Sequence, residues 1–372
     1  MSSKSVPLVL RILVQVLIVL LPASAARAAE PVTVYCSADE QFARPILADF
    51  GRRCGVAVRP VFDTEAGKTT GLVHRLLAER GRPRADVWWS SEVFGTIQLA
   101  EAGVLAAYDP AAAADIPSQF RDPQHRWTGL AARARVLAYD PRRTPPDRLP
   151  RAWADLARPE FKGRLAMANP IFGTTRGQMA VFAARWGEAA LGDYFAGLRR
   201  NEVRLADGNA QAVLLVARGV VELAATDTDD VLVAQARGDT VAIHFPDLDA
   251  PSDGAARSPT RDAPPARRGT VWIPNSVALV AGGPNPEGAR ALMDLLVSAE
   301  MERRLALSES ANVPVRAAVR KQIIRTAKPR WDGSIGLPKL FEAFEQAGPC
   351  DFAAAAARLR KTDAMTKEIL LR

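Results

Sequence analysis

The sequence predicts an α/β protein of two lobes with a ligand cleft between them. Apolar residues alternate along the chain between the period of a strand and the period of a helix. This alternation occurs in two separate series, and polar residues stand directly after the strands of each series. The length of 372 residues and the 48% hydrophobic content suit two domains of ordinary size.

Residues 1–28 are typical of a secretory signal peptide. Basic residues precede a run from Ile12 to Leu21 in which only Gln15 is polar, and a stretch of small residues follows. A run of this length is too short to cross a bilayer, which needs roughly 20 apolar residues. We therefore expect cleavage near Ala28 and a soluble protein in the periplasm.

The first series begins after the signal peptide. Short runs rich in Val, Phe and Trp predict strands, while apolar residues three and four positions apart predict helices. In chain order, we expect a strand at 32–35, a helix at 42–50, a strand at 56–62, a helix at 72–77, a strand at 86–89 and a helix at 97–103. Strands and helices that alternate in this way predict a parallel sheet with crossover helices.

A second series follows a segment rich in Ala, Pro and Arg. The same criteria predict a strand at 164–167, a helix at 175–186, a strand at 203–205, a helix at 210–217 and a strand at 222–225, and a further strand is predicted separately at 270–280. Residues 246–268 lack apolar periodicity and are expected to form a surface loop, and amphipathic helices fill much of the remainder. We expect one lobe to comprise residues 29–128 and 270–320, and the other to comprise residues 129–269 and 321–372.

Composition excludes several classes of protein. Removal of the signal peptide lowers the formal charge from +8 to +5, and the remaining basic residues form no cluster that could bind nucleic acid. The chain has no G-x-S-x-G element, and its three histidines stand far apart, so we expect neither an enzyme nor a zinc site. Cys36 and Cys54 fall at opposite ends of a predicted parallel pair, too far apart for a disulfide, whereas a pair of Cys54 with Cys350 stays open.

Ligands of open α/β sheets bind at the carboxyl ends of the strands, so the residues just after each strand are the candidates for a site. Any one of them could instead cap the helix that follows. The carboxylates are candidate ligands for a metal or a solute, and they are Asp39, Glu40, Glu92, Asp227, Asp229 and Asp230. The candidates for binding an anion are Ser90, Ser91, Gly173, Thr174, Thr175, Asn209 and Lys68.

Three of these stretches have distinctive sequences. Gly173 to Thr175 is the best anion candidate, because a glycine before a helix N-terminus lets an anion approach free backbone N–H groups. Lys68 belongs to a segment that resembles a phosphate-binding loop, but Phe62 occupies the position of the required first glycine. Residues 225–231, ATDTDDV, crowd three carboxylates at a strand end, and we expect one of them to cap a helix that starts near Val231.

The chain resembles the ferric-iron class of solute-binding proteins of bacterial ABC transporters, which have the type II periplasmic-binding fold. The resemblance covers nearly the whole chain after the signal peptide and depends on the order and spacing of several motifs. They lie at residues 34–37, 85–92, 99–105, 170–175 and 273–279. It implies a hinged, two-lobed receptor that captures a solute in the periplasm and delivers it to a membrane permease.

The resemblance also implies a ligand set. Ferric members hold iron through two adjacent tyrosines, a carboxylate and an anion at a helix N-terminus. Here the anion position matches Gly173 to Thr175, with Asn209 beside it, and the carboxylate position matches Glu92. The tyrosine pair falls on Asp229 and Asp230, and none of the four tyrosines of the chain are adjacent to one another.

Carboxylates are hard oxygen ligands that bind Fe³⁺, Ca²⁺ or Mg²⁺, and they also accept hydrogen bonds from an amine or a polyol. The resemblance makes ferric iron with a synergistic anion the expected ligand. A phosphorylated or phosphonate solute is the alternative, and a binding protein that serves a periplasmic sensor uses the same fold. We expect a monomer that binds the permease subunits of an ABC importer, needs no cofactor and binds no nucleic acid.

Overall fold

The computed structural model describes residues 30–63, 67, 69–248, 269–326 and 336–372. Residues 31–372 belong to one compact unit. The predicted signal peptide, Lys68 and positions 249–268 of the predicted loop lie outside the described residues.

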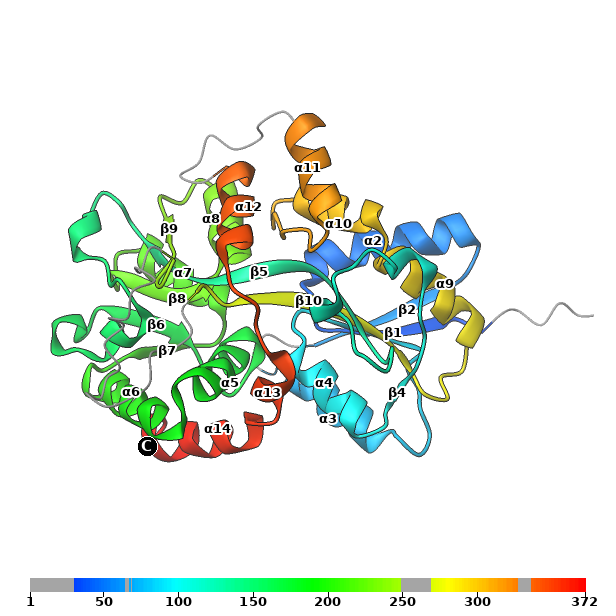
Figure 1. The fold of residues 1–372 in the computed structure, drawn as a ribbon, viewed down its shortest axis with the longest axis horizontal. Helices are drawn as coiled ribbons and strands as arrows, with labels where there is room; N and C mark the ends of the chain where they lie inside the picture. The colour runs from blue at the N-terminus through cyan, green and yellow to red at the C-terminus, as the bar shows by residue number, and fades with distance from the viewer. Residues whose placement is uncertain (1–29, 64–66, 68, 249–268, 327–335) are drawn as a thin grey trace, which may run out of the picture. The chain divides into compact units, whose positions relative to one another are not determined.

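The described strands form one mixed sheet with the order β2-β1-β3-β10-β5-β8-β6-β7, in which β4 also pairs with β10 and β9 with β5 (Figure 1). The strands are β1 (Val32–Cys36), β2 (Val58–Phe62), β3 (Val87–Ser90), β4 (Leu105–Ala106), β5 (Thr128–Tyr139), β6 (Leu165–Ala168), β7 (Arg204–Ala206), β8 (Leu223–Asp227), β9 (Ala242–His244) and β10 (Trp272–Val280).

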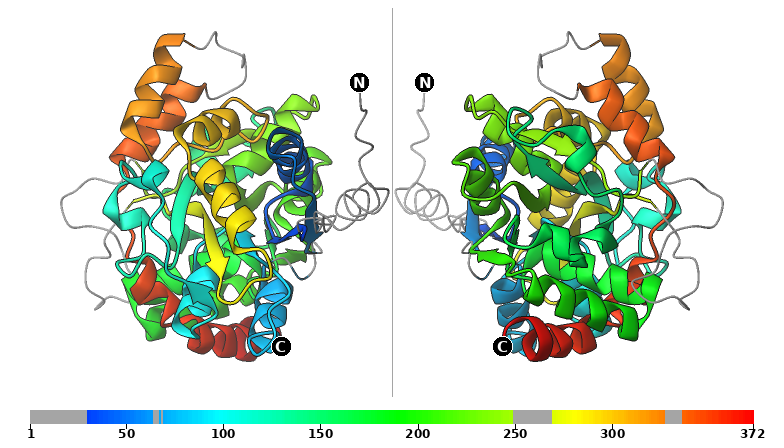
Figure 2. Two further views of the ribbon diagram at one scale, coloured as in Figure 1. Left: turned by 90° about the vertical axis from the view of Figure 1, so that its right-hand side faces the viewer. Right: turned by 90° about the vertical axis from the view of Figure 1, so that its left-hand side faces the viewer.

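Helices flank the sheet, and Figures 1 and 2 show α11 at the top of the view and α14 at the bottom. The helices are α2 (Glu40–Cys54), α3 (Thr70–Ala78), α4 (Phe94–Glu101), α5 (Gly173–Trp186), α6 (Glu188–Arg200), α7 (Asn209–Ala217), α8 (Thr228–Ala236), α9 (Pro286–Leu296), α10 (Ala299–Ala306), α11 (Ala317–Thr326), α12 (Leu337–Gln346), α13 (Phe352–Ala356) and α14 (Leu359–Met365). None of the helices described is both long enough and apolar enough to span a membrane.

The two series predicted from the sequence form two parallel groups of strands. In one group β1 pairs in parallel with β2 and β3, and in the other β6 pairs in parallel with β7 and β8. The antiparallel strands β10 and β5 join the groups, because β10 pairs with β3 and β5 while β5 also pairs with β8. The prediction of parallel sheets with crossover helices is thus confirmed for both series.

The longest strand, β5, and the helix α6 were not predicted. All residues of β5 except Tyr139 are buried, as expected for a central strand covered on both faces. Arg133 and Arg135 interrupt its apolar pattern, and both are buried because they have carboxylate partners. A prediction based on the spacing of apolar residues therefore misses this strand.

The pairing of β5 with β10 contains an irregularity at Ala131. Leu130 lies opposite Asn275 and Ala132 lies opposite Pro274, so Ala131 is an extra residue, and the register shifts between Pro274 and Asn275. Ala131 has a φ of +38°, in the left-handed region that costs a non-glycine residue roughly 1–2 kcal/mol. Two side-chain contacts hold it there: its N–H donates to Glu302 Oε1 at 3.1 Å, and its carbonyl oxygen accepts from Asn275 Nδ2 at 2.6 Å.

The short helix α13 packs against both α4 and α5. Its first residue, Phe352, makes an edge contact with Phe94 of α4 at a centroid distance of 5.9 Å and also lies 6.3 Å from Phe120. Phe94 in turn fills the space beside Gly177 of α5. These contacts join the C-terminal part of the chain to helices on both sides of the β5–β10 pair.

Cys54 and Cys350 do not form the disulfide that the sequence left open. Both have free thiols, with Cys54 exposed and Cys350 half-buried. Burial and hydrogen bonds therefore hold the fold together without a covalent link between these residues.

The close contact at Gly177 leads to a prediction about stability. A Cβ atom at Gly177 lies 2.2 Å from the ring of Phe94, and that ring is buried and cannot move aside, so we expect G177A to lower the free energy of unfolding by about 1–3 kcal/mol. The matched control is G192A in α6, where the new methyl group meets its neighbours at 3.6 Å. We expect G192A to leave stability unchanged or to raise it by about 0.5–1 kcal/mol. Urea denaturation of both variants tests this, and equal stability of the two contradicts the assigned packing.

Candidate functional site

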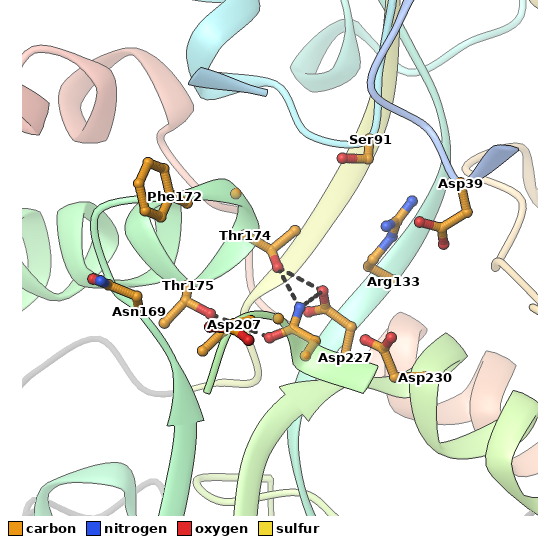
Figure 3. A pocket seen from close by; sticks show the side chains of 14 residues that line it. Asp39, Ser91, Arg133, Asn169, Phe172, Thr174, Thr175, Asp207, Asp227 and Asp230 are labelled. Carbon is orange, nitrogen blue, oxygen red and sulfur yellow. Dashed lines mark hydrogen bonds between the residues drawn. The ribbon is translucent and has the colours of Figure 1, made fainter. Parts of the chain in front are cut away.

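One pocket lies at the carboxyl ends of the parallel strands, where the sequence predicted the site (Figure 3). Its lining comes from the ends of β6 and β8, from the segments after β1, β3, β6 and β7, from the first turns of α5, α7 and α8, and from one residue of β5. The lining residues are Asp39, Ser91, Arg133, Ala168, Asn169, Phe172, Gly173, Thr174, Thr175, Asp207, Gly208, Asn209, Asp227 and Asp230.

The structure brings most of the predicted site residues together and separates the others. The predicted residues that line the pocket are Asp39, Ser91, Gly173, Thr174, Thr175, Asn209, Asp227 and Asp230. Glu40 lies on the exposed side of α2, where it pairs with Arg44. Ser90, Glu92 and Asp229 are buried close by but are not part of the pocket lining, and Lys68 lies outside the described residues.

Asp227 forms the central ion pair of the pocket with Arg135. Arg135 has no exposure to solvent, and its Nη1 donates to Asp227 Oδ1 at 2.8 Å. The other carboxylate oxygen, Oδ2, accepts from Thr174 Oγ1 at 2.6 Å and from Asn209 Nδ2 at 2.8 Å, as the dashed lines of Figure 3 show. Since both oxygens already accept hydrogen bonds, Asp227 organises the pocket through its contacts with α5, α7 and β5.

The predicted helix cap in residues 225–231 differs from the observed one. Helix α8 starts at Thr228, three residues before Val231, with Asp227 in the N-cap position. The Asp227 side chain accepts no hydrogen bond from the helix backbone, because it is committed to Arg135 instead. Thr228 Oγ1 also points away from the helix and accepts from Ala134 N of β5 at 3.1 Å.

Asp229 makes a second buried ion pair. Its Oδ2 lies 3.3 Å from Nε of Arg133, and both side chains are less than one-tenth exposed. Burial raises the pKa of Asp229 above its ordinary value, and the charge of Arg133 opposes this shift. Burial also works against the charged form of Arg133, but the surrounding carboxylates outweigh it and raise the pKa of Arg133.

Three carboxylates of the pocket region lie close enough to hold one cation. Asp227, Asp229 and Asp230 each offer an oxygen atom, and these atoms lie within 4.8 Å of one another. In Figure 3, Asp39, Arg133 and Asp230 lie next to one another on the side of the pocket away from Thr175. Arginine therefore partly neutralises this acidic cluster, and Asp227 and Asp230 line the pocket together with Asp39.

The opposite side of the pocket suits an anion. Helix α5 begins at Gly173 and α7 begins at Asn209, and the first residues of both helices line the pocket. The first N–H groups of a helix have no partner within the helix and lie at the positive end of its dipole. Gly173 has a φ of +52°, a conformation that glycine adopts without strain. The pocket thus brings helix N-termini and carboxylates together, and Asp227 contacts the first residues of both helices.

Glu92 was predicted to offer a carboxylate from the turn after β3. The structure directs its side chain into the start of α4, where it accepts hydrogen bonds from the backbone N–H groups of Phe94 and Gly95. Burial is the largest influence and raises the pKa of Glu92 to about 7, although these hydrogen bonds favour the charged form.

None of the four tyrosines, all of which are described, lines the pocket. The Tyr35 hydroxyl donates to Glu79 Oε2 at 2.8 Å, and burial together with this bond raises the pKa of Tyr35 to about 12. The Tyr108 hydroxyl donates to Asp294. A metal in this pocket would have no phenolate ligand.

Comparison with known proteins defines the family. The family model for the bacterial extracellular solute-binding proteins matches residues 95–334, more than half of the chain. The chain belongs to this family. Relatives include an Fe(3+)-binding periplasmic protein of Serratia marcescens (30% identity over 148 residues, 40% of this chain and 42% of that protein) and iron uptake protein A1 of a Synechocystis strain (24% identity, 78% of this chain and 77% of that protein). A putative 2-aminoethylphosphonate-binding periplasmic protein of Salmonella typhi is 27% identical over 73% of each chain.

Solved structures with the same fold cover almost the whole chain. Iron-bound HitA from Pseudomonas aeruginosa superposes with a TM-score of 0.71 at 21% identity, over 90% of this chain and 98% of that one. A Trichodesmium protein in complex with iron and citrate superposes with a TM-score of 0.68 at 19% identity, over 91% and 99% of the two chains. At this level of identity the likeness concerns the fold. It confirms that the solute-binding protein has the type II periplasmic-binding fold that the sequence predicted.

The sequence prediction missed Arg133, which lines the pocket, and Arg135, which pairs with the lining residue Asp227. They stand two positions apart in an apolar stretch, TGLAARARVLAY, so they point to the same side of the strand. Two basic residues two positions apart among apolar residues are unusual. The apolar neighbours indicate that the segment is buried, and a buried charge needs a partner of opposite charge. That signal was available in the sequence, and it pairs naturally with the acidic stretch at 227–230.

The buried pair leads to a prediction about stability. We expect R135M to lower the free energy of unfolding by about 3–5 kcal/mol, because Asp227 is left as an unpaired buried charge. Adding D227L should recover most of this loss. The matched surface control, K162M, breaks the exposed pair of Lys162 with Glu202 and should cost less than about 1 kcal/mol. Denaturation at neutral pH measures all three, and a small effect of R135M contradicts the importance of the pair.

A second prediction concerns pH. Glu92 keeps its proton to about pH 7 in the folded protein, against an ordinary value of 4.5, so its contribution to stability is present below pH 4.5 and is lost as the pH rises through 7. The variant E92Q cannot ionise. We expect it to gain stability relative to the wild type between these pH values, with E40Q on the exposed face of α2 as the control. Urea midpoints measured from pH 4 to 8 test this, and a constant difference between E92Q and wild type contradicts it.

Proposed function

We propose that this protein is the exported receptor of an ABC importer, which captures a small solute in the periplasm and delivers it to the permease subunits. The family, the fold and the position of the pocket support this proposal. Its lobes are residues 29–128 with 270–320 and residues 129–269 with 321–372, and they close over the pocket as a monomer. The protein needs no catalytic cofactor, and its role is capture of a solute, not catalysis.

The proposed solute is ferric iron together with a synergistic anion. The single observation that carries this proposal is that carboxylates and helix N-termini meet in one pocket. The oxygen atoms of Asp227, Asp229 and Asp230 lie within 4.8 Å of one another, and Thr174 at the start of α5 contacts Asp227 and lines the same pocket. Carboxylate oxygens suit a hard cation, and the helix N-termini suit its anion. The names of the Serratia and Synechocystis relatives, which refer to Fe(3+) and iron, agree with this choice.

A phosphonate or phosphorylated organic solute is the second candidate, and one observation favours it. Arg133 and Arg135 already neutralise part of the acidic cluster, and no tyrosine lines the pocket. A zwitterionic solute would direct its amine to Asp39 and Asp230 and its oxyanion to the start of α5. The Salmonella relative named for 2-aminoethylphosphonate supports this candidate.

The two candidates differ in what the purified protein carries. We expect the exported protein to retain iron and a small anion, detected by elemental analysis and native mass spectrometry. The double variant D39N/D230N should lose most of the iron, because these carboxylates reach the pocket lining. The control D294N removes a carboxylate that contacts Tyr108 and does not line the pocket, and it should retain the iron.

Calorimetric titration separates the candidates further. Binding of ferric citrate to the wild type, weakened in D39N/D230N, supports iron capture. Binding of 2-aminoethylphosphonate in the absence of metal supports the second candidate and contradicts the first. Binding of neither compound contradicts both choices of solute.

A further inference from the structure

Arg133 is the one basic side chain among the residues that line the described pocket. It extends from β5, it is only 5% exposed, and Figure 3 shows it beside Asp39. Its Nη2 donates to Asn275 Oδ1 at 2.9 Å, and its Nε lies 3.3 Å from Asp229 Oδ2. Among the described residues its Nη1 has no hydrogen-bond partner, so a charged donor in the pocket is left open.

A ring of buried polar side chains fixes the direction of this guanidinium group. Asn275 of β10 accepts from Arg133 and donates to Asn312 Oδ1 at 2.9 Å. Asn312 donates to Asp229 Oδ2 at 3.3 Å, and Asp229 completes the ring by pairing with Arg133. All four side chains belong to residues that are at most 5% exposed.

The ring is also joined to the irregular part of β5. Asn275 Nδ2 donates to the carbonyl oxygen of Ala131, the extra residue with a positive φ. The ring therefore connects the paired strands β5 and β10, the segment after α10 and the first turn of α8. Removing one member of a buried polar network leaves its neighbours without a hydrogen-bond partner, which is costly. We therefore expect the loss of either amide to change the position of the Arg133 guanidinium group.

We propose that Arg133 binds an oxyanion of the captured solute through Nη1, and that Asn275, Asn312 and Asp229 are positioning residues that hold it for this contact. The inference rests on the proposed function, since it assigns the same pocket. The oxyanion belongs either to the anion that accompanies iron or to a phosphonate group, and a guanidinium recognises both in the same way. Asp229 accordingly acts on the oxyanion through its ion pair with Arg133.

The first test measures affinity for ferric citrate and for 2-aminoethylphosphonate. For the probe that binds, we expect R133M and N312A each to weaken binding by about tenfold. In the double variant R133M/N312A the second change should add less than about twofold, because Asn312 acts through Arg133. The variant R133K keeps the charge if R133M fails to fold, and it should also bind weakly because lysine lacks the planar fork.

The matched control is N201A. Asn201 is likewise a buried asparagine, but it donates to the carbonyl oxygens of Leu156 and Arg158, away from the pocket. N201A should lower thermal stability and leave the affinity unchanged. Full additivity of R133M and N312A, or wild-type affinity in R133K and N312A, overturns the proposal.

A second test does not depend on the identity of the solute. The NMR signal of the Arg133 side chain should shift when inorganic phosphate is added to the wild type, and it should lose this response in N312A. If the wild type binds neither ferric citrate nor 2-aminoethylphosphonate but phosphate shifts this signal, the choice of solute fails and the role of Arg133 stands. An Arg133 signal that phosphate does not change overturns the inference, whichever solute binds.

Discussion

Arg135 carries a full charge at a position with no exposure to solvent, and such a charge is stable only when an opposite charge and several hydrogen bonds surround it. Asp227 supplies the opposite charge, while Gln178, Thr174 and Thr175 of α5 and Asn209 of α7 supply the hydrogen bonds. These partners come from elements that are far apart in the sequence. One guanidinium group thus holds β5, β8 and the starts of α5 and α7 at fixed distances from one another. The pocket lies beside these elements, and residues of each of them line it.

This constraint changes the chemistry of the acidic stretch after β8. Three neighbouring carboxylates would repel one another and attract a cation if they stood alone. Arg135 pairs with Asp227 and Arg133 pairs with Asp229, so two of these three carboxylates already have a cationic partner inside the protein. A solute with both a cationic and an anionic part matches this distribution better than a bare cation does.

The sequence allowed the parallel strand groups and the strand-end position of the site to be predicted, because both follow from local periodicity and from the geometry of parallel sheets. Thr174, Asn209 and Asp230, which follow three different strands in the sequence, line one pocket. Strand β5 was missed because tertiary ion pairs, not apolar residues, allow Arg133 and Arg135 to be buried. The direction of the Glu92 side chain could not be predicted from the sequence either, since a carboxylate after a strand can face either a pocket or the helix that follows it.

The packing of α13 has a mechanical consequence. Phe352 touches Phe94 of α4 while its helix also lies against α5, so the spacing of these two helices is set partly by aromatic contacts at the C-terminal end of the chain. Any rearrangement that separates α4 from α5 must slide or break these ring contacts and expose apolar surface to water. The C-terminal segment thereby adds a hydrophobic energy barrier to the movement of the helix whose N-terminus lines the pocket. Phe352 lies about 180 residues after Gly173 in the sequence, and the entropy of closing a loop rises only slowly with its length, so a contact this distant costs little more than a nearer one.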